Sequence, residues 1–374
     1  MILKPVSLHT SRTIGFTAWV LAALLGGNPA LAQDNGGLGP LSVRSLFPPM
    51  LPYLAFSPEV PTTLSQGKQR FFYQYALGNT FINTQAPGHG AAPEITSTQV
   101  ARGLTLADFP STGYRAYIDM EVERHQFSYR LGVVESLELG VDLAWVTLGG
   151  GKLDGSIESF ERPFGGLNLD RTHSQRNRFD YYLTQNGQFL VNTSQGASKV
   201  PQDPVFRIKW NWWEGGDVTP AVSVLFLAKH ALVPQPGPVR SLASSGYGDY
   251  GYYMLISKQI DSVVAHIQFG TTQLGDNRGR FNQQLWNQIF GLEFRSDPEN
   301  SWLVQIETRS SQFKDEIQGT SGDIQFLSRP SDVLMLGHKF HGDTWLFDIG
   351  LVEDYNQSQN ETDIVLFTTI GWEW

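Results

Sequence analysis

Apolar and polar residues alternate with a period of two in many stretches of this chain after residue 68. In 204–213, four bulky apolar side chains alternate with Arg207 and Lys209, and 263–272 and 300–310 repeat the pattern. Such alternation predicts strands with one apolar face. About twelve stretches carry it, an even number, as in single-chain bacterial outer-membrane barrels. The predicted strands run near 68–82, 112–133, 137–148, 204–213, 218–229, 249–259, 263–272, 283–295, 300–310, 332–340, 344–354 and 363–374. In the second of these, the apolar pattern changes face near Arg124 to Gln126, which suggests a bulge.

Short and long connections between these stretches alternate. Turns of a few residues, such as 135–136 and 261–262, are separated by segments as long as 149–203. Short periplasmic turns and long external loops are the plan of an outer-membrane barrel. The pattern therefore predicts an all-β, transmembrane antiparallel up-and-down β-barrel with an N-terminal segment outside the barrel wall.

The last predicted strand is apolar on one face and ends in aromatic residues. Trp374, Trp372 and Ile370 share this face, whereas Glu373 and Gly371 lie on the other. A terminal strand of this kind is typical of the closing strand of such barrels. We expect the first three side chains to face lipid and the strand to pair with the one beginning near Lys68.

The first 32 residues are typical of a secretory signal peptide. Lys4 and Arg12 precede an apolar stretch over 14–25, and Ala30-Leu31-Ala32 is a small-residue cleavage site. The alternative is a single membrane anchor, but the apolar stretch is shorter than the roughly 20 residues that span a bilayer. We therefore expect an exported protein in the bacterial outer membrane.

The segment 33–67 is rich in proline and does not read as a strand of the wall, because proline lacks the ladder donor. Its many apolar residues favour packing inside the barrel, and the alternative is a loosely ordered tail. The predicted organisation is a signal peptide over 1–32, this segment over 33–67 and the barrel over 68–374. The residues that we expect to plug the barrel are Phe47, Met50, Leu51, Tyr53 and Phe56.

Composition restricts the chemistry. The chain has no cysteine, so it has no disulfide and no thiol site. Its net charge of −9 and the lack of a basic stripe argue against nucleic acid as a partner. Its mean hydropathy of −0.22 is too polar for a helical membrane protein but fits alternating strands.

Charged residues are predicted on the inner faces of several strands. They could form an ion pathway, or a network of paired charges that stiffens a narrow barrel, and the second reading is favoured. The candidate lumen charges are Asp119, Glu121, Glu123, Asp142, Arg207, Lys209, His266 and Glu307.

Tryptophans fall at the ends of the predicted strands. This position is typical of the aromatic girdles at the two membrane interfaces. The predicted interface residues are Trp145, Trp212, Trp286, Trp302, Trp345, Trp372 and Trp374.

The loop 149–203 carries a glycine run at 149–155, which lacks the spacing of a phosphate-binding loop and is rejected as a nucleotide site. A short helix is expected near 156–162. The loop also carries a basic cluster, which could bind lipopolysaccharide phosphates or lie solvated at the tip of the loop. Its members are Arg171, His173, Arg176 and Arg178.

The sequence offers little evidence for an enzyme active site. An acyl hydrolase needs a histidine beside a serine, yet His266 has Val264 and Gln268 as its neighbours on the same strand face. We therefore expect no catalytic residue, no cofactor and no metal.

Several short segments resemble one family. They are Pro40 to Pro48, Tyr117 to Glu121, Leu137 to Val141 and Phe160 to Leu167 with the basic residues that follow. With these segments the chain resembles the domain of unknown function 3187 family of Gram-negative outer-membrane proteins. Ser45 and Phe47 depart from the asparagines expected there. The resemblance implies a β-barrel and transfers no catalytic residue.

The sequence thus predicts an outer-membrane barrel acting as a passive or gated channel for a small or slender solute. The alternative is a non-transport barrel with a surface-binding or structural role, which acts through its external loops. Expected partners are outer-membrane lipid, lipopolysaccharide and the barrel-assembly machinery, while the oligomeric state is left open.

Overall fold

The computed structural model describes residues 37–83, 95–109, 111, 113–151, 153–161, 176–234, 236–237, 239–275, 281–314, 325–355 and 361–374. The predicted signal peptide, together with Arg171 and His173, lies outside these residues. No helix in the described part of the chain is long and apolar enough to cross a membrane.

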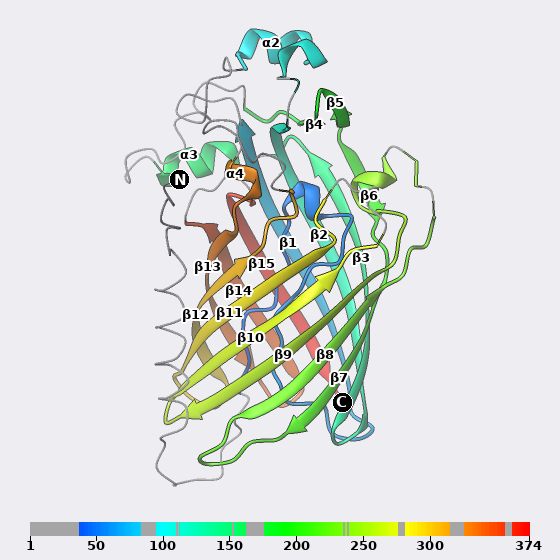
Figure 1. Cartoon of the computed structure of the whole chain (residues 1–374). Coiled ribbons are helices and arrows are strands. Elements are labelled where there is room, and N and C mark those ends of the chain that lie inside the picture. The colour runs from blue at the N-terminus through cyan, green and yellow to red at the C-terminus, as the bar shows by residue number, and fades with distance from the viewer. Residues whose placement is uncertain are drawn as a thin grey trace, which may run out of the picture.

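In the described part of the chain, fifteen strands form one sheet, and twelve of them close into an antiparallel barrel (Figure 1). Closure is made by β1 and β15, which pair from Arg70 opposite Glu373 to Asn79 opposite Ile364. The predicted all-β barrel is therefore confirmed. The twelve strands are β1 Gln69–Asn83, β2 Tyr114–Val134, β3 Leu137–Gly149, β7 Val205–Trp213, β8 Ala221–Lys229, β9 Asp249–Ile260, β10 Val263–Gln273, β11 Gln284–Arg295, β12 Asn300–Arg309, β13 Ser331–His341, β14 Trp345–Asp354 and β15 Ile364–Glu373.

Short and long connections lie at opposite ends of the barrel, which we call the short-turn end and the long-loop end (Figure 1). The long-loop end carries most of the remaining elements. They are the helices α2 Ser97–Arg102, α3 Asp154–Glu161 and α4 Gln325–Ser328, and the strands β4 Asp180–Gln185, β5 Gln188–Thr193 and β6 Ala197–Pro201. The helix near 156–162 was expected from the sequence, but the three short strands were not.

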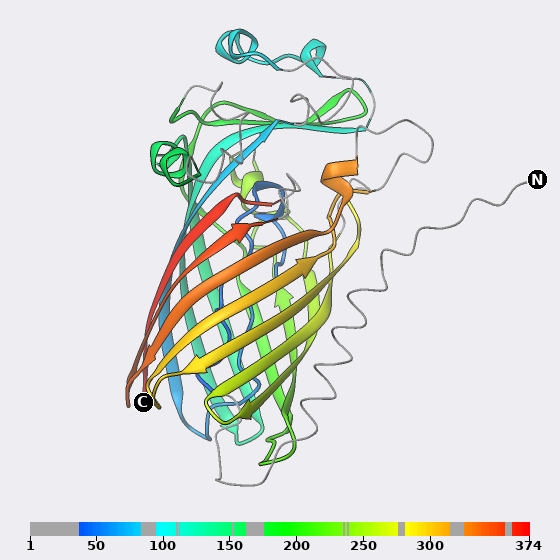
Figure 2. The same cartoon turned by 90° about the vertical axis from the view of Figure 1, so that its left-hand side faces the viewer.

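β1 and β2 rise above the rest of the wall and extend the sheet at the long-loop end (Figure 2). β4 pairs with β2 from Tyr114 to Asp119, and β5 pairs with β4. A small apolar cluster packs α2 against this extension. Its members are Ile95, Val100, Leu104, Phe109, Tyr117 and Tyr182.

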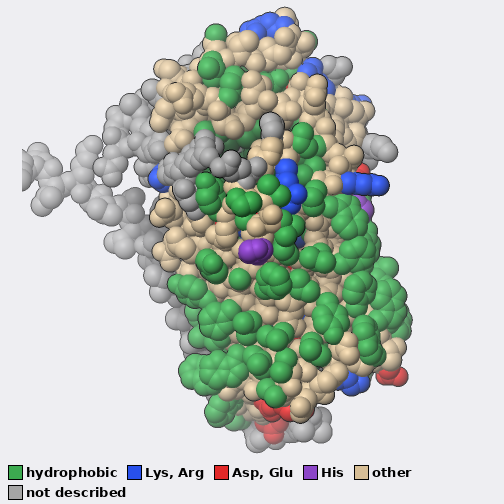
Figure 3. Space-filling view, turned by 90° about the vertical axis from the view of Figure 1, so that its right-hand side faces the viewer, with side chains coloured by type: hydrophobic (Ala, Val, Ile, Leu, Met, Phe, Trp, Pro, Cys, Tyr) green, Lys and Arg blue, Asp and Glu red, His purple; other side chains and the backbone are tan. Residues whose placement is uncertain are grey.

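The outer surface over the barrel strands is largely apolar (Figure 3). On β7, for example, Phe206, Ile208 and Trp210 are exposed while Arg207 and Lys209 are buried. Apolar side chains outside and polar ones inside reverse the order of a soluble protein, as expected of a wall in contact with lipid.

Candidate functional site in the barrel lumen

Residues 37–67, which we call the plug, run inside the barrel (Figures 1 and 2). The chain ascends from the short-turn end, turns at the 3-10 helix η1 Pro48–Met50 and descends to the start of β1. Its polar contacts reach strands on every side of the ring, from β1 and β3 through β8 to β12. A segment that touches opposite walls in this way fills the lumen.

The turn of the plug packs among aromatic side chains near the long-loop end. Phe47 meets Phe313 edge-on with 6.5 Å between ring centroids, and Tyr53 meets Phe281 at 5.8 Å. Phe47, Met50 and Leu51 are all buried. On the descending arm, Phe56 stacks on Tyr253 of β9 at 3.9 Å. The apolar residues of the segment therefore seal it against the wall.

The ascending arm is held by hydrogen bonds from its backbone. The N–H groups of Leu38 and Gly39 donate to Glu293 of β11, at 2.9 and 3.1 Å. Higher up, the N–H of Leu41 donates to Gln305, and Ser45 Oγ donates to Glu361 at 2.6 Å.

The descending arm is anchored in the same manner. The N–H of Leu54 donates to Asp249 at 2.8 Å, while Lys229 Nζ donates to the carbonyl of Pro52 and lies 2.9 Å from the Asp249 carboxylate. Nearer the short-turn end, the carbonyl of Pro61 accepts from Asn211 and Ser223. The wall thus satisfies polar backbone groups that have no sheet partner, which buried groups require.

An ion cluster joins the plug to β2, β3 and β7. Glu59 lies against Arg207, with Arg130 Nη2 3.5 Å and Lys209 Nζ 3.7 Å from its carboxylate oxygens. Asp142 lies 2.8 Å from Arg130 and 3.0 Å from Arg207. The cluster continues through Glu138, whose carboxylate lies 3.2 Å from Lys209 and accepts from the N–H of Leu64 at 3.0 Å.

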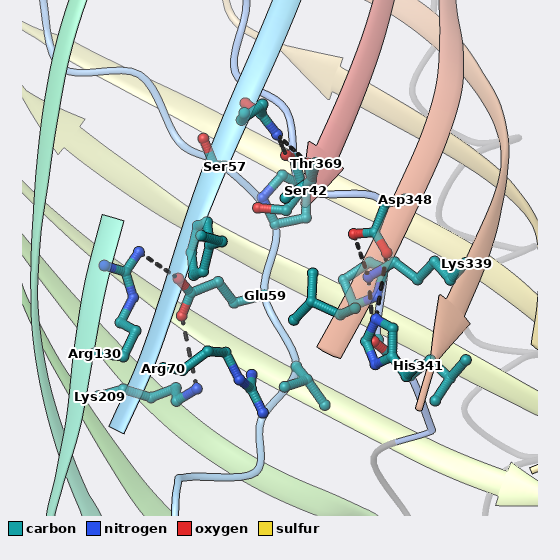
Figure 4. Close-up of a pocket in the computed structure, with 18 of the residues that line it drawn as sticks. Ser42, Ser57, Glu59, Arg70, Arg130, Lys209, Lys339, His341, Asp348 and Thr369 are labelled. Atoms are coloured by element: carbon teal, nitrogen blue, oxygen red, sulfur yellow. Dashed lines mark hydrogen bonds and ion pairs between the residues drawn. The ribbon is translucent and has the colours of Figure 1, made fainter. Parts of the chain in front are cut away.

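Beside this cluster the lumen contains a cavity of about 80 Å³, room for several water molecules (Figure 4). Glu59, Arg130 and Lys209 line one side. A second ionic group lines the other, in which Asp348 lies 3.4 Å from Lys339 and 3.3 Å from His341. The site is therefore a small charged chamber between the plug and the wall.

The structure brings several predicted lumen residues together. Asp142, Arg207 and Lys209 share the cluster around Glu59. Glu307 is buried and lies 2.6 Å from Arg309, which also contacts Glu361. Glu59 itself was not among the predicted residues, because it is a single acidic residue in a proline-rich segment.

His266 belongs to a buried hydrogen-bonded chain across three strands. Its Nδ1 lies 2.7 Å from Ser257 Oγ, and its Nε2 lies 3.1 Å from Glu293. Strand alternation does not predict this serine, because Ser257 lies on β9, opposite His266 on β10. All three side chains are fully buried, and Glu293 also accepts a hydrogen bond from the plug backbone. These hydrogen-bonded side chains therefore help to hold the plug.

The prediction that Asp119, Glu121 and Glu123 face the lumen is wrong. The ladder between β1 and β2 runs without interruption from Leu131 to Tyr117, so these residues share the outer face with exposed Phe127. The bulge predicted near Arg124 is likewise absent from this ladder, and the one irregularity between β2 and β3 falls between Gly132 and Val134.

What changes along β2 is the polarity of its two faces. Below Arg124 the inner face carries Gln126 and Arg130, whereas above it the inner residues Met120 and Val122 are apolar and buried. At this height loops cover the outer face, and Glu121 accepts a hydrogen bond from the N–H of Leu153. This part of β2 extends beyond the apolar belt of the outer surface. The alternation of apolar and polar residues therefore reverses here, although each residue keeps the face that the register of the strand gives it.

The predicted interface tryptophans lie on the outer surface. Trp145 is half-buried and stacks on His125 with 5.0 Å between ring centroids. The other six are exposed, namely Trp212, Trp286, Trp302, Trp345, Trp372 and Trp374. Of the basic loop residues, Arg178 pairs with Asp180 at 2.8 Å.

Comparison with solved structures finds the same fold. The barrel is similar to the COG4313 outer membrane channel from Pseudomonas putida F1, with 7% sequence identity, 84% of this chain and 98% of that chain covered, and a TM-score of 0.52. The toluene transporter TbuX from Ralstonia pickettii matches with 9% identity over 91% of this chain and 98% of its own, but its TM-score of 0.37 carries no argument. At this identity the likeness shows a channel-type barrel fold and not a solute.

Among curated proteins no match was found. A family model does match, with the description "Protein of unknown function (DUF3187)", over residues 20–202. The matched region includes the plug, β1 to β3 and the three short strands of the long-loop end. The resemblance drawn from the sequence is thereby confirmed, because residues 20–202 match the model of this family of unknown function.

Proposed function

We propose that this protein is a gated channel of the bacterial outer membrane for small polar solutes, closed by its plug. The short-turn end then faces the periplasm and the long-loop end faces outward, as in known barrels. The observation that carries the proposal is a segment that fills the lumen but is held there largely by side-chain contacts, with no strand pairing to the wall.

The lining of the lumen includes apolar side chains such as Leu225 and Leu255, and its polar groups favour a polar solute. At the height of the apolar outer belt, the inner faces carry Gln126, Arg207, Ser223, Gln268 and Gln305, all buried against the plug. If the plug moved aside, these groups would border an aqueous path. A twelve-stranded barrel is wider than the eight-stranded barrels that side chains fill, and narrower than sixteen-stranded porins, so the path would suit a small molecule.

The test is the conductance of the refolded protein in planar bilayers, with and without residues 37–64. Removing the plug is expected to convert rare openings into steady current. Absence of current from both forms would refute the channel. Equal current from both would show that the plug does not close it.

The alternative is a barrel with a shut lumen that binds a partner through the long-loop end. The extension made by β4, β5 and α2 favours it, because its own apolar cluster gives it a defined shape. Deleting residues 180–193 separates the two readings. Lost surface binding with unchanged permeability would support the alternative, and altered permeability alone would count against it.

A further inference from the structure

We propose that Arg130, Arg207 and Lys209 form a binding site for the carboxylate of a small solute, and that Glu59 of the plug occupies it in the closed channel. The three cations come from β2 and β7 and converge on one carboxylate of the plug. The proposal rests on the proposed function in one respect, since a solute reaches the site fully only when the plug yields.

Without Glu59, the cluster of wall side chains carries an unbalanced positive charge. The three cations share the cluster with two wall carboxylates, Glu138 and Asp142. With Glu59 the group holds three positive and three negative charges, and without it one positive charge remains. All five wall side chains are buried while the plug is in place, so in a variant that keeps the plug but lacks the Glu59 carboxylate this charge has little water to stabilise it. An anion from the solution would restore the balance.

The hydrogen bonding of Arg207 points in the same direction. Its Nη1 donates to Asp142 at 3.0 Å. Its Nη2 is in ion-pair contact with Glu59 Oε1. Within the described part of the chain, however, neither Nη2 nor the buried Nε makes a hydrogen bond of good geometry, and Glu59 Oε2 accepts none. Glu59 therefore lies close to Arg207 but out of line with these donors. A guanidinium presents a planar fork that matches a carboxylate through two parallel bonds. A free carboxylate could adopt that geometry, whereas one tethered to the plug backbone does not.

The neighbouring cavity provides room for the rest of the molecule. It adjoins the three cations and is also lined by Gln74, Gln126 and Ser57, which offer hydrogen bonds to hydroxyl groups. These features describe a short, hydroxylated monocarboxylate, for which lactate is a suitable probe and lactamide its uncharged counterpart.

Ligand-observed saturation-transfer NMR of the full-length protein in detergent tests the site independently of conduction. The Glu59→Gln variant is expected to bind lactate and not lactamide, at least about tenfold more tightly than the unaltered protein, because the competing carboxylate is gone. A second change, Arg207→Gln, should weaken this binding by about tenfold or more, as loss of hydrogen bonds to a charged group predicts.

Arg70→Gln in the same Glu59→Gln background is the matched control. Arg70 also lines the cavity, but it pairs with Glu373 and not with Glu59. Lactate binding should survive there. Equal signals from lactate and lactamide, or binding unaffected by Arg207→Gln, would overturn the site. If Arg207→Gln fails to fold on a heat-modifiability gel, Lys209→Gln makes the same test. A plug deletion that conducts while lactate fails to bind would refute only this site and leave the channel standing.

Discussion

Glu293 on β11 accepts a hydrogen bond from the backbone N–H of Leu38 at 2.9 Å, joining the start of the plug to the far wall of the barrel. The other carboxylate oxygen accepts from the N–H of Gly39 and lies 3.1 Å from His266 Nε2. Gly37, at φ +57°, fits because a side chain there would collide with Glu293. One carboxylate thus fixes the backbone at which the plug enters the lumen.

Replacing this carboxylate should release the ascending arm. Glu293→Ala leaves two backbone N–H groups without an acceptor, and each unsatisfied buried donor destabilises the closed state by about 1–3 kcal/mol. We expect the open probability in planar bilayers to rise by about tenfold or more, and Glu293→Gln, which keeps one acceptor oxygen, to have a smaller effect. Unchanged gating in both variants would show that this anchor does not hold the plug.

The descending arm is expected to depend on the stacked pair of Phe56 and Tyr253. Phe56→Ala removes a buried ring, which typically costs about 3–5 kcal/mol. Because the lost contact is between plug and wall, the channel should open more often while the barrel keeps its mobility on an unboiled gel. Phe226→Ala on the exposed outer face is the control and should leave gating unchanged. A collapse of the barrel itself in Phe56→Ala would contradict a separable plug.

Labelling can test which face of β2 carries the acidic residues. The chain has no cysteine, so single cysteines report one position each. Glu123→Cys on the outer face should react with a bulky, membrane-impermeant maleimide added outside intact cells. Gln126→Cys, buried beneath the plug, should react far more slowly. The opposite order would restore the lumenal placement.

The end of β15 should decide insertion. The backbone N–H and carbonyl of Trp374 both bond to Gln69 at 3.0 Å, which completes the ring, and the Trp374 side chain is 55% exposed. Trp374→Asp would place a carboxylate where lipid is expected. We predict loss of the heat-modifiable form from the outer-membrane fraction while export continues. Insertion at the level of the unaltered protein would show that this residue is dispensable.

Sequence periodicity was sufficient to predict the twelve barrel strands, because lipid outside and polar groups inside impose the same alternation on each. It failed along the upper part of β2, where Glu121 and Met120 keep their faces but the surroundings of those faces change. The short strands β4 to β6 were not predicted, because they are too short to show a clear alternation of apolar and polar residues. The partners of Glu59 could not be predicted either, since burial and charge pairing there depend on how the plug folds back between distant strands.

The central claim, that the plug closes the lumen and must move for current to flow, can be tested with a reversible lock. A Cβ at Gly78 of β1 would lie 3.2 Å from the Cβ of Leu46, about half an ångström below the usual disulfide separation of about 3.8 Å. The double variant Leu46→Cys/Gly78→Cys should therefore join plug and wall when oxidised. Leu46→Cys alone is the control for effects of the reductant.

Planar-bilayer conductance of this double variant before and after reduction is the decisive measurement. The oxidised form should stay closed, and dithiothreitol should restore openings at the frequency of the single-cysteine control. The same current in both states, once mass spectrometry has shown that the disulfide formed and was then reduced, would contradict the account.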